Sequence, residues 1–180
     1  MITYVNSDLF ESPAQVLVNA VNTVGVMGKG IALDFRQRYP DMFRRYQELC
    51  EHQQFNIGQL WLYKTSDRWI LNFTTKRHWR GPSTLSFIET GLKVFVSTYE
   101  QKHIASISFP MLGCGHGGLE WESQVQPLME RYLNSLPISI YIHVPDTAGL
   151  FLQPSDVPLF VASSLNDTDD YSEELIGDPL

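Results

Sequence analysis

Apolar residues along the chain fall into two patterns, short continuous runs and longer segments with helical spacing. Between Ser83 and Glu100 they recur every three or four residues, which predicts a helix with one buried face. Short runs such as Val16–Val21 are bounded by polar residues and glycines, which predicts strands. The predicted strands are Ile2–Val5, Val16–Val21, Gln59–Lys64, Trp69–Phe73, Ile104–Met111 and Ile138–Val144, and the predicted helices are Ile31–Tyr39, Asp41–Cys50, Ser83–Glu100 and Trp121–Leu133.

The order of these elements predicts the fold class. Strands alternate with helices, which is typical of an α/β domain with three α/β/α layers and a largely parallel central sheet. Gln59–Lys64 and Trp69–Phe73 flank a Ser66-Asp67 turn and form a predicted hairpin, so the sheet is expected to be mixed. Ligands of such sheets bind beyond the carboxyl ends of the strands, where loops with functional residues are expected.

Charge is distributed unevenly along the chain. The net charge is −7, but all 13 Lys and Arg residues lie at or before Arg131, whereas eight of the 20 acidic residues follow it. Residues 1–131 therefore carry 13 basic and 12 acidic side chains, a net charge of +1. This balance does not exclude a nucleic-acid substrate. Residues 151–180 are predicted to be an acidic, partly disordered extension, in which Val157–Ala162 could pack on the domain and 166–180 is expected to be disordered.

Length and composition narrow the class of protein. A chain of 180 residues is expected to form one domain with a sizeable core. Cys50 and Cys114 can form no disulfide framework and lack metal-ligand spacing, so no metal is expected. No cofactor is expected either. The N-terminus lacks the regions of a signal peptide, and no apolar run approaches the roughly 20 residues that span a bilayer. We therefore expect a cytoplasmic protein without membrane contact, and we also expect a monomer.

The first glycine-rich loop lies between a predicted strand and a predicted helix, in Leu17–Ala32 (LVNAVNTVGVMGKGIA). A strand, a glycine loop and a helix in this order present backbone N–H groups and a positive helix terminus to phosphate. Taken alone, the loop is as readily interpreted as a flexible turn. Asn19 and Asn22 favour a ligand site, because their amides add hydrogen-bond donors and acceptors near the end of the strand.

The second glycine-rich loop is Gly113–Leu119 (GCGHGGL). It contains G-x-G-x-x-G, but it comes late in the chain and no following strand supplies the acidic residue of a dinucleotide site. In the first loop, Thr23 and Gly30 replace the leading Gly and the final Ser or Thr of a Walker motif. The sequence therefore indicates neither an ordinary dehydrogenase nor a P-loop NTPase. Two glycine loops on neighbouring strands can instead hold a pyrophosphate from both sides.

A basic segment lies between the two loops, in Asn72–Pro82 (NFTTKRHWRGP). A solvated basic loop with its indole tucked beneath it is one interpretation. The other is an active-site loop in which Lys76, directly after the strand, points into the crevice. Its cations would then contact phosphates, and its aromatic ring would stack on a base. Arg77, Trp79 and Arg80 are therefore candidate DNA-binding residues.

These segments together resemble the macrodomain family. The Asp8 segment, VNAVNT with MGKGIA, the strand ending in Phe109-Pro110, and GCGHGGL occur in the family's order. VMGKGIAL with F-x-x-R-Y-P, N-F-x-T-K-R-H-W-R and GCGxGGL-x-W resemble the branch of DNA ADP-ribosyl glycohydrolase antitoxins, which is related to the human terminal ADP-ribose protein glycohydrolase. The resemblance covers residues 1–150 and implies a macrodomain there.

The resemblance implies an ADP-ribose pocket. Asp8 would accept a hydrogen bond from the adenine amino group, Asn22 and the first loop would face the distal ribose, and the second loop would bind the diphosphate. The implied ADP-ribose contacts are Asp8, Leu9, Asn19, Asn22, Gly28, Lys29, Gly30, Ile31, Gly113, Cys114, Gly115, His116, Gly117, Gly118 and Leu119.

Lys76 matches the catalytic lysine of this branch. The human enzyme also uses an aspartate in the second glycine loop, and Gly117 stands at that place here. His78, or a water held by Asn22, is the candidate substitute for that carboxylate. Lys76 could attack the anomeric carbon, or as a cation stabilise charge on the leaving base.

The implied function is removal of ADP-ribose from thymidine bases of DNA, by an antitoxin that opposes a DNA ADP-ribosyltransferase toxin. The expected partners are ADP-ribose, ADP-ribosylated DNA and that toxin. Three alternatives remain open: removal of ADP-ribose from protein carboxylates, a non-catalytic ADP-ribose reader, and an O-acetyl-ADP-ribose deacetylase.

Overall fold

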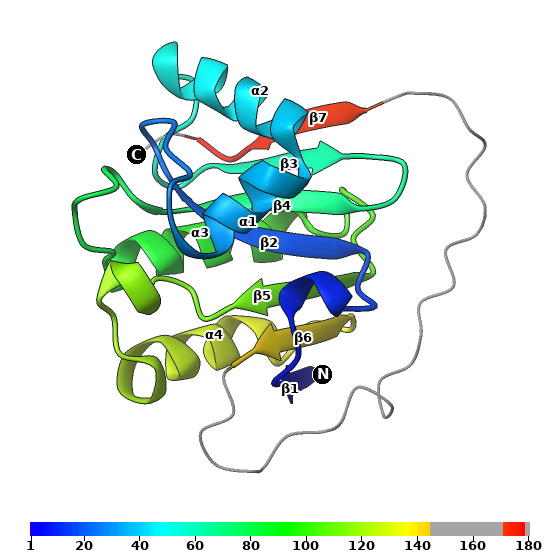
Figure 1. Ribbon diagram of the computed structural model, residues 1–180. Coiled ribbons are helices and arrows are strands. Elements are labelled where there is room, and N and C mark those ends of the chain that lie inside the picture. The colour runs from blue at the N-terminus through cyan, green and yellow to red at the C-terminus, as the bar shows by residue number, and fades with distance from the viewer. Residues whose placement is uncertain (145–170, 179–180) are drawn as a thin grey trace.

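The computed structural model describes residues 1–144 and 171–178 and confirms the predicted α/β architecture (Figure 1). Three short helical turns accompany its strands and α-helices: η1 (Leu9–Glu11), η2 (Gly115–Gly117) and the π-helical η3 (Trp121–Val125). The strands are β1 (Ile2–Val5), β2 (Val16–Asn22), β3 (Leu60–Lys64), β4 (Trp69–Lys76), β5 (Ser106–Pro110), β6 (Ser139–His143) and β7 (Ser172–Ile176), and the α-helices are α1 (Gly30–Arg38), α2 (Pro40–Glu51), α3 (Leu85–Thr98) and α4 (Gln126–Leu133).

The strands form one mixed sheet in the order β1-β6-β5-β2-β4-β3-β7. The strand pairs β1–β6, β6–β5, β5–β2 and β2–β4 are parallel, and β3 is antiparallel to both β4 and β7. The predicted hairpin and the largely parallel sheet are therefore both confirmed. Because the parallel strands share one direction, their carboxyl ends meet at one edge, on the left of Figure 1.

The two faces of the sheet are covered by different helices. Alternate residues of β2 divide between two buried clusters: Val16 and Val18 pack with α3 and α4, and Leu17 packs with α1 and α2. This division follows from the period of two along a strand. In Figure 1, α1 and α2 lie in front of the sheet and α3 behind it, which gives the three predicted layers.

Helix α3 approaches β4 unusually closely. A Cβ atom at Gly91 would lie 2.3 Å from the Phe73 ring, so only glycine allows this contact. The predicted apolar face of the helix is buried here, with Ile88, Leu92 and Phe95 at most 1% exposed. This packing holds β4, and with it the residues at the end of β4, in a fixed position.

β4 continues three residues beyond the predicted end at Phe73. Thr74 donates its hydroxyl to the carbonyl of Gln59, and Thr75 donates to that of Val21. The polarity of the threonines predicts the start of a loop, but their branched side chains suit a strand whose neighbours accept these hydrogen bonds. Lys76 is consequently the last residue of the strand and not the first residue of a loop.

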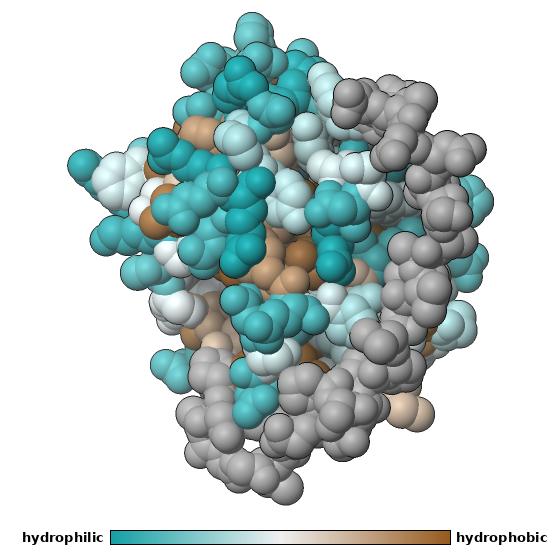
Figure 2. Space-filling view, turned by 45° about the vertical axis from the view of Figure 1, so that its right-hand side comes forward, coloured by the Kyte–Doolittle hydropathy of each residue, from teal (hydrophilic) through white to brown (hydrophobic). Residues whose placement is uncertain are grey.

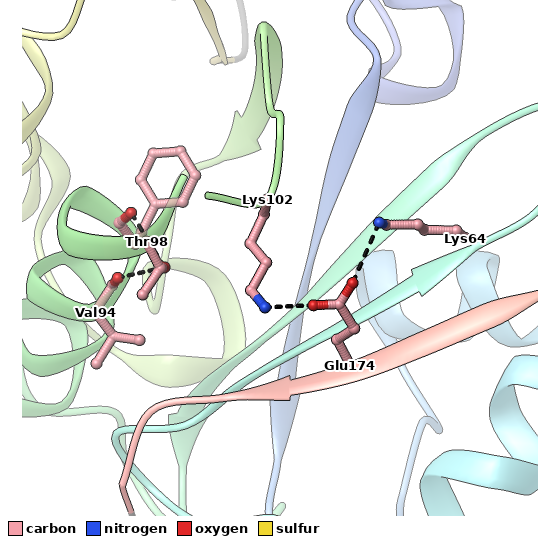
Figure 3. Close-up of polar contacts among 6 residues, drawn as sticks. Lys64, Val94, Thr98, Lys102 and Glu174 are labelled. Carbon is pink, nitrogen blue, oxygen red and sulfur yellow. Dashed lines mark hydrogen bonds and ion pairs between the residues drawn. The ribbon is translucent and has the colours of Figure 1, made fainter. Parts of the chain in front are cut away.

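The prediction of disorder throughout 166–180 is wrong at Ser172–Ile176, which forms β7 on the edge of β3. Glu174 accepts hydrogen bonds from the Nζ atoms of Lys64, at 3.4 Å, and Lys102 (Figure 3). Glu173 pairs with Arg45 of α2 at 2.7 Å. The acidic composition predicts a solvated tail. This prediction fails because the cations that neutralise these carboxylates come from distant parts of the sequence. The expected packing of Val157–Ala162 and the domain boundary at residue 150 lie outside the described residues.

On the face shown in Figure 2, hydrophilic side chains cover most of the described surface, and hydrophobic ones appear mainly in recesses between them. None of the helices in residues 1–144 and 171–178 has the length and apolar character needed to span a membrane.

Candidate active site

A cavity of about 910 Å³ opens at the carboxyl ends of the parallel strands. Both glycine-rich loops, the β1–η1 connection and the end of β4 contribute to its wall. The predicted site residues that line it are Asp8, Leu9, Asn22, Gly28, Lys29, Gly30, Ile31, Lys76, Trp79, Arg80, Gly113, Cys114, Gly115, His116 and Gly117.

Asn22 organises the first glycine loop. Its Nδ2 donates to the carbonyl of Val26 at 2.6 Å, and its Oδ1 accepts from the N–H groups of Val24 and Val26. The single hydrogen of the buried Tyr46 hydroxyl is shared between the Asn22 carbonyl oxygen, at 2.7 Å, and Asn22 Oδ1, at 3.0 Å. Both ends of the Asn22 amide are thus engaged in shaping the loop, which suits a positioning role better than the holding of a catalytic water.

The amino terminus of α1 faces the cavity. Lys29 precedes the helix and makes no side-chain capping bond, while Gly30, Ile31 and Ala32 in the first turn line the cavity. Gly30 has a positive φ of 55°, which favours glycine at the entry to the helix. Uncapped N–H groups and the positive end of the helix dipole make this turn suitable for an anionic ligand.

The second glycine loop packs too tightly on Ser83 to carry a larger residue at 117. A Cβ atom at Gly117 would lie 2.4 Å from Ser83 Oγ, and the Ser83 N–H donates to the Gly117 carbonyl at 2.9 Å. An aspartate therefore does not fit at residue 117 unless the loop or Ser83 is displaced. Burial raises the pKa of the Cys114 thiol to about 11, so this cysteine is poorly suited to act as a nucleophile near neutral pH.

Lys76 connects the end of β4 to the second glycine loop. It lies opposite Asn22 in the sheet register, just after an irregularity between Val21 and Asn22. Its Nζ donates a hydrogen bond to the carbonyl of His116 at 2.8 Å. Burial lowers the pKa of Lys76, which increases the share of neutral amine at a given pH.

The basic segment after β4 forms one side of the cavity mouth. Trp79 is 44% exposed, lines the cavity, stacks on the His78 ring at 5.4 Å and carries the Arg80 guanidinium 4.4 Å from its ring centre. Arg77 and His78 do not line the cavity. The Arg77 guanidinium lies 5.5 Å from the ring centre of Phe87, and His78 Nδ1 accepts from the Arg80 N–H at 3.2 Å.

Asp8 begins the short turn after β1. Its Oδ1 accepts the N–H of Phe10 at 2.9 Å and caps η1. The exposed carboxylate also lines the cavity. The capping role and the ligand role are therefore compatible, because each can use a different oxygen.

Three predicted ligand contacts lie outside the cavity lining, namely Asn19, Gly118 and Leu119. Asn19 is fully buried and donates from Nδ2 to Asn72 Oδ1 at 2.9 Å, between β2 and β4. Gly118 takes a left-handed conformation that ends η2. For Asn19 the reason is its depth in the strand: it lies three residues before Asn22, and its side chain is enclosed in the helix–sheet core beside Met27.

Several cavity residues carry no signal in the sequence. Met111 and His143 line the cavity, but each lies in a predicted apolar strand and matches no motif. Thr75 lines it too, and its one signal is its place in the N-F-x-T-K-R-H-W-R segment. Asn6 and Ser7 also line it. Their position after the predicted strand Ile2–Val5 is the available signal, since ligands bind at strand ends.

Comparison with known proteins places this geometry in a family. Residues 18–128 match the Macro domain family model. A Mycobacterium tuberculosis protein named DNA ADP-ribosyl glycohydrolase is 41% identical over 159 residues, which cover 86% of this chain and 43% of that protein. A Thermosipho africanus protein named as a DNA ADP-ribosyl transferase–DNA ADP-ribosyl glycohydrolase fusion is 39% identical over 163 residues, covering 80% of this chain and 42% of that protein. This chain thus spans less than half the length of these curated relatives.

Two solved structures are similar over most of the described fold. The macrodomain of Thermus aquaticus DarG has a TM-score of 0.74 and 39% identity, with 81% of this chain and 99% of that chain covered. Thermosipho africanus DarTG in complex with ADP-ribose has a TM-score of 0.77 and 38% identity, with 86% and 43% covered. The family match over more than half of the chain, the sheet order and the two glycine loops at one cavity lead to the same conclusion: this chain belongs to the macrodomain family.

Proposed function

We propose that this protein hydrolyses the glycosidic bond between ADP-ribose and thymidine bases of DNA. The observation that carries the proposal is the position of Lys76, whose amine lies between the two glycine loops in a cavity large enough for a nucleotide. The similarity to the Mycobacterium and Thermosipho glycohydrolases supports the choice of substrate.

ADP-ribose can be placed in the cavity by its chemistry. The α1 terminus and the second glycine loop offer backbone N–H groups to the diphosphate. Asp8 can accept the adenine amino group at one end. The distal ribose then lies by Gly28–Gly30 and Lys76, where the first glycine loop is shaped by Asn22.

The reaction breaks the bond between the anomeric carbon of ADP-ribose and a base nitrogen, with water supplying a hydroxyl to the carbon and a proton to the base. The transition state has oxocarbenium character, so a group near this carbon has most effect when its interaction strengthens as the bond breaks. The lowered pKa of Lys76 supports attack by its neutral amine. As a cation, the same group would stabilise charge on the leaving base. Neither of these two roles of Lys76 uses a second carboxylate at residue 117.

The DNA strand is assigned to the cavity mouth. Trp79 offers a partly exposed ring there, and Arg80 adds a cation that can meet a phosphate. His78 is not assigned a catalytic role, because its ring stacks on Trp79 outside the cavity. Arg77 remains a candidate phosphate contact on the outer surface.

The proposed biological role is that of an antitoxin for a DNA ADP-ribosyltransferase toxin. The name of the Thermosipho relative, which joins transferase and glycohydrolase in one chain, supports such a partner. We propose that the protein acts as a monomer in the cytoplasm, where toxin and modified DNA occur.

One preparation of the protein, assayed on three substrates, tests this function. We expect release of ADP-ribose from a thymidine-modified oligonucleotide, with far slower reaction on a glutamate-modified protein and on O-acetyl-ADP-ribose. Lys76→Ala is the matched control for contaminating activity. Preference for the modified protein or the acetyl ester would replace the proposed substrate, and binding of ADP-ribose without turnover of any substrate would indicate a reader.

A further inference from the structure

His143 is a buried histidine in the cavity wall to which the proposed reaction gives no role. It is the last residue of β6, it is 9% exposed, and it lines the cavity together with Ser7 and Asp8. Its two ring nitrogens contact different parts of the chain, so its position connects the sheet to the β1–η1 turn.

The first contact fixes the tautomer of the ring. His143 Nδ1 lies 2.9 Å from the carbonyl oxygen of Ser7. A carbonyl oxygen can only accept, so Nδ1 must carry the hydrogen. In the neutral ring, Nε2 is then an acceptor. Burial lowers the pKa of His143, against smaller opposing effects of the Ser7 carbonyl and the Asp8 charge, and this favours the neutral form.

The second contact extends into a chain of buried hydroxyls. His143 Nε2 lies 3.4 Å from Ser108 Oγ, which lies 2.5 Å from Ser12 Oγ. Ser12 Oγ accepts the N–H of Ala14 at 3.1 Å. One direction satisfies every group: Ser12 donates to Ser108, Ser108 donates to Nε2, and Nδ1–H donates to Ser7. Since Ser108 and Ser12 are at most 3% exposed, an unpaired member of this chain would be costly.

The contact between His143 and Ser7 affects the position of Asp8. The Ser7 carbonyl belongs to the peptide unit that leads directly into Asp8, so His143 holds the main chain at this point. The Phe10 N–H holds Oδ1 of the Asp8 side chain. Together the two contacts fix the direction of the carboxylate relative to the cavity.

We propose that His143 is a positioning residue that sets selectivity for adenine, by holding the Ser7–Asp8 peptide unit in the orientation in which Asp8 meets the base. This inference rests on the proposed function, in which Asp8 accepts the adenine amino group. His143 itself is not expected to touch the reacting atoms.

Binding of two ligands to His143 variants tests the inference. The probes are ADP-ribose and inosine diphosphate ribose, which has a carbonyl oxygen in place of the amino group and so presents an acceptor, not a donor, at the position that faces Asp8. Wild type should prefer ADP-ribose, and Asp8→Asn should lose that preference. In His143→Phe, which cannot donate to Ser7, the preference should fall at least about fivefold, or roughly 1 kcal/mol.

Two conservative variants separate positioning from general damage. In His143→Asn an amide N–H can take the place of Nδ1–H and should restore most of the preference, whereas His143→Gln places its amide nearer Nε2 and should not. Melting temperatures identify any variant that fails to fold, and the Asn–Gln pair then decides the question.

The outcomes also separate this inference from the proposed function. Wild-type preference in both His143→Phe and His143→Gln would overturn the role of His143. Failure of the wild type to bind ADP-ribose would overturn the proposed function. Wild-type binding without preference between the two ligands would overturn the Asp8 assignment together with the inference.

Discussion

Lys76 of β4 and His116 of the second glycine loop are joined by a hydrogen bond of 2.8 Å from Nζ to the carbonyl oxygen. The bond reaches from the end of a strand to the second glycine loop, whose glycines carry no side chains that could make such a bond. It places the amine in the cavity and ties the loop to the sheet. Because the acceptor is a backbone carbonyl, side-chain substitutions at residue 116 leave this contact available.

Substitution of Lys76 is expected to reduce turnover far more than affinity for ADP-ribose. Lys76→Ala should bind ADP-ribose within about tenfold of wild type, roughly 1.4 kcal/mol, because the two glycine loops supply most contacts with the diphosphate. Turnover of modified DNA should fall about 100-fold or more, since a group that acts mainly in the transition state affects rate more than affinity. Calorimetry and single-turnover assays measure the two quantities. Wild-type turnover in Lys76→Ala would remove the catalytic assignment.

The pH dependence of the rate distinguishes the two roles of Lys76. Burial disfavours the cation and lowers the pKa of Lys76, so its neutral amine forms at lower pH than that of an exposed lysine. If the neutral amine attacks, the rate should rise with pH and level off above this lowered pKa. Lys76→Arg should then be inactive, because arginine stays charged. A rate that falls with rising pH, together with partial rescue by arginine, would indicate charge stabilisation instead.

Asp8→Asn should weaken ADP-ribose binding by about 1–3 kcal/mol, roughly 5- to 150-fold in Kd. Asparagine keeps an oxygen to cap the Phe10 N–H but replaces the other carboxylate oxygen with an amide that cannot accept from adenine. Glu11→Gln is the matched control, since Glu11 lies in the same turn and does not line the cavity. Equal affinity of Asp8→Asn and wild type, measured by calorimetry, would show that adenine binds elsewhere.

Removal of the cations beside the cavity should reduce the salt dependence of DNA binding. In Arg77→Ala/Arg80→Ala, the slope of log affinity against log salt should become shallower by about 0.7 for each phosphate that the arginines neutralise in the wild type. Arg131→Ala serves as the control, because Arg131 is exposed on α4 and does not line the cavity. If the double variant and the control had the same slope in fluorescence-anisotropy titrations, the DNA would have to lie on another surface.

Removal of residues 171–180 should lower the melting temperature, because it exposes the edge of β3 and frees Lys64 and Lys102. Glu174→Gln tests the ion pairs alone and should cost about 0.5–1 kcal/mol, since the carboxylate is partly solvated. Asp178→Asn, at an exposed position, is the control.

The stabilising effect of Glu174, measured by comparison with Glu174→Gln, should depend on pH. The Lys102 hydrogen bond lowers the pKa of Glu174 in the folded chain, so the ionised form stabilises the fold at neutral pH. That contribution is lost as pH falls through the lowered pKa. The difference in melting temperature between wild type and Glu174→Gln should therefore shrink in acid. A constant difference between neutral pH and about pH 3 would contradict the assignment of the stabilisation to these ion pairs.

The sequence is most informative where function depends on local patterns. Helical spacing and apolar runs predict the layers, and two glycine loops at strand ends predict the cavity that Lys76 and Asn22 share. It is least informative where partners are distant in the chain. The hydrogen bond between His143 and Ser7 spans 136 positions, and the pairing of Glu173 with Arg45 spans 128. No local pattern contains such a pair, so composition alone predicts a solvated tail for the acidic segment.

The pairing of β3 with β7 has a consequence for how the protein is made. β3 is complete at residue 64, but its outer partner is complete only at residue 176, which is 112 residues later. At ribosomal rates of about 5–20 residues per second, this separation corresponds to roughly 6–22 s. During that interval the apolar strand LWLYK presents an unpaired edge, the kind of surface through which nascent chains aggregate. A ribosome-bound chain that has not yet reached residue 176 is therefore expected to depend more on chaperones than the finished domain.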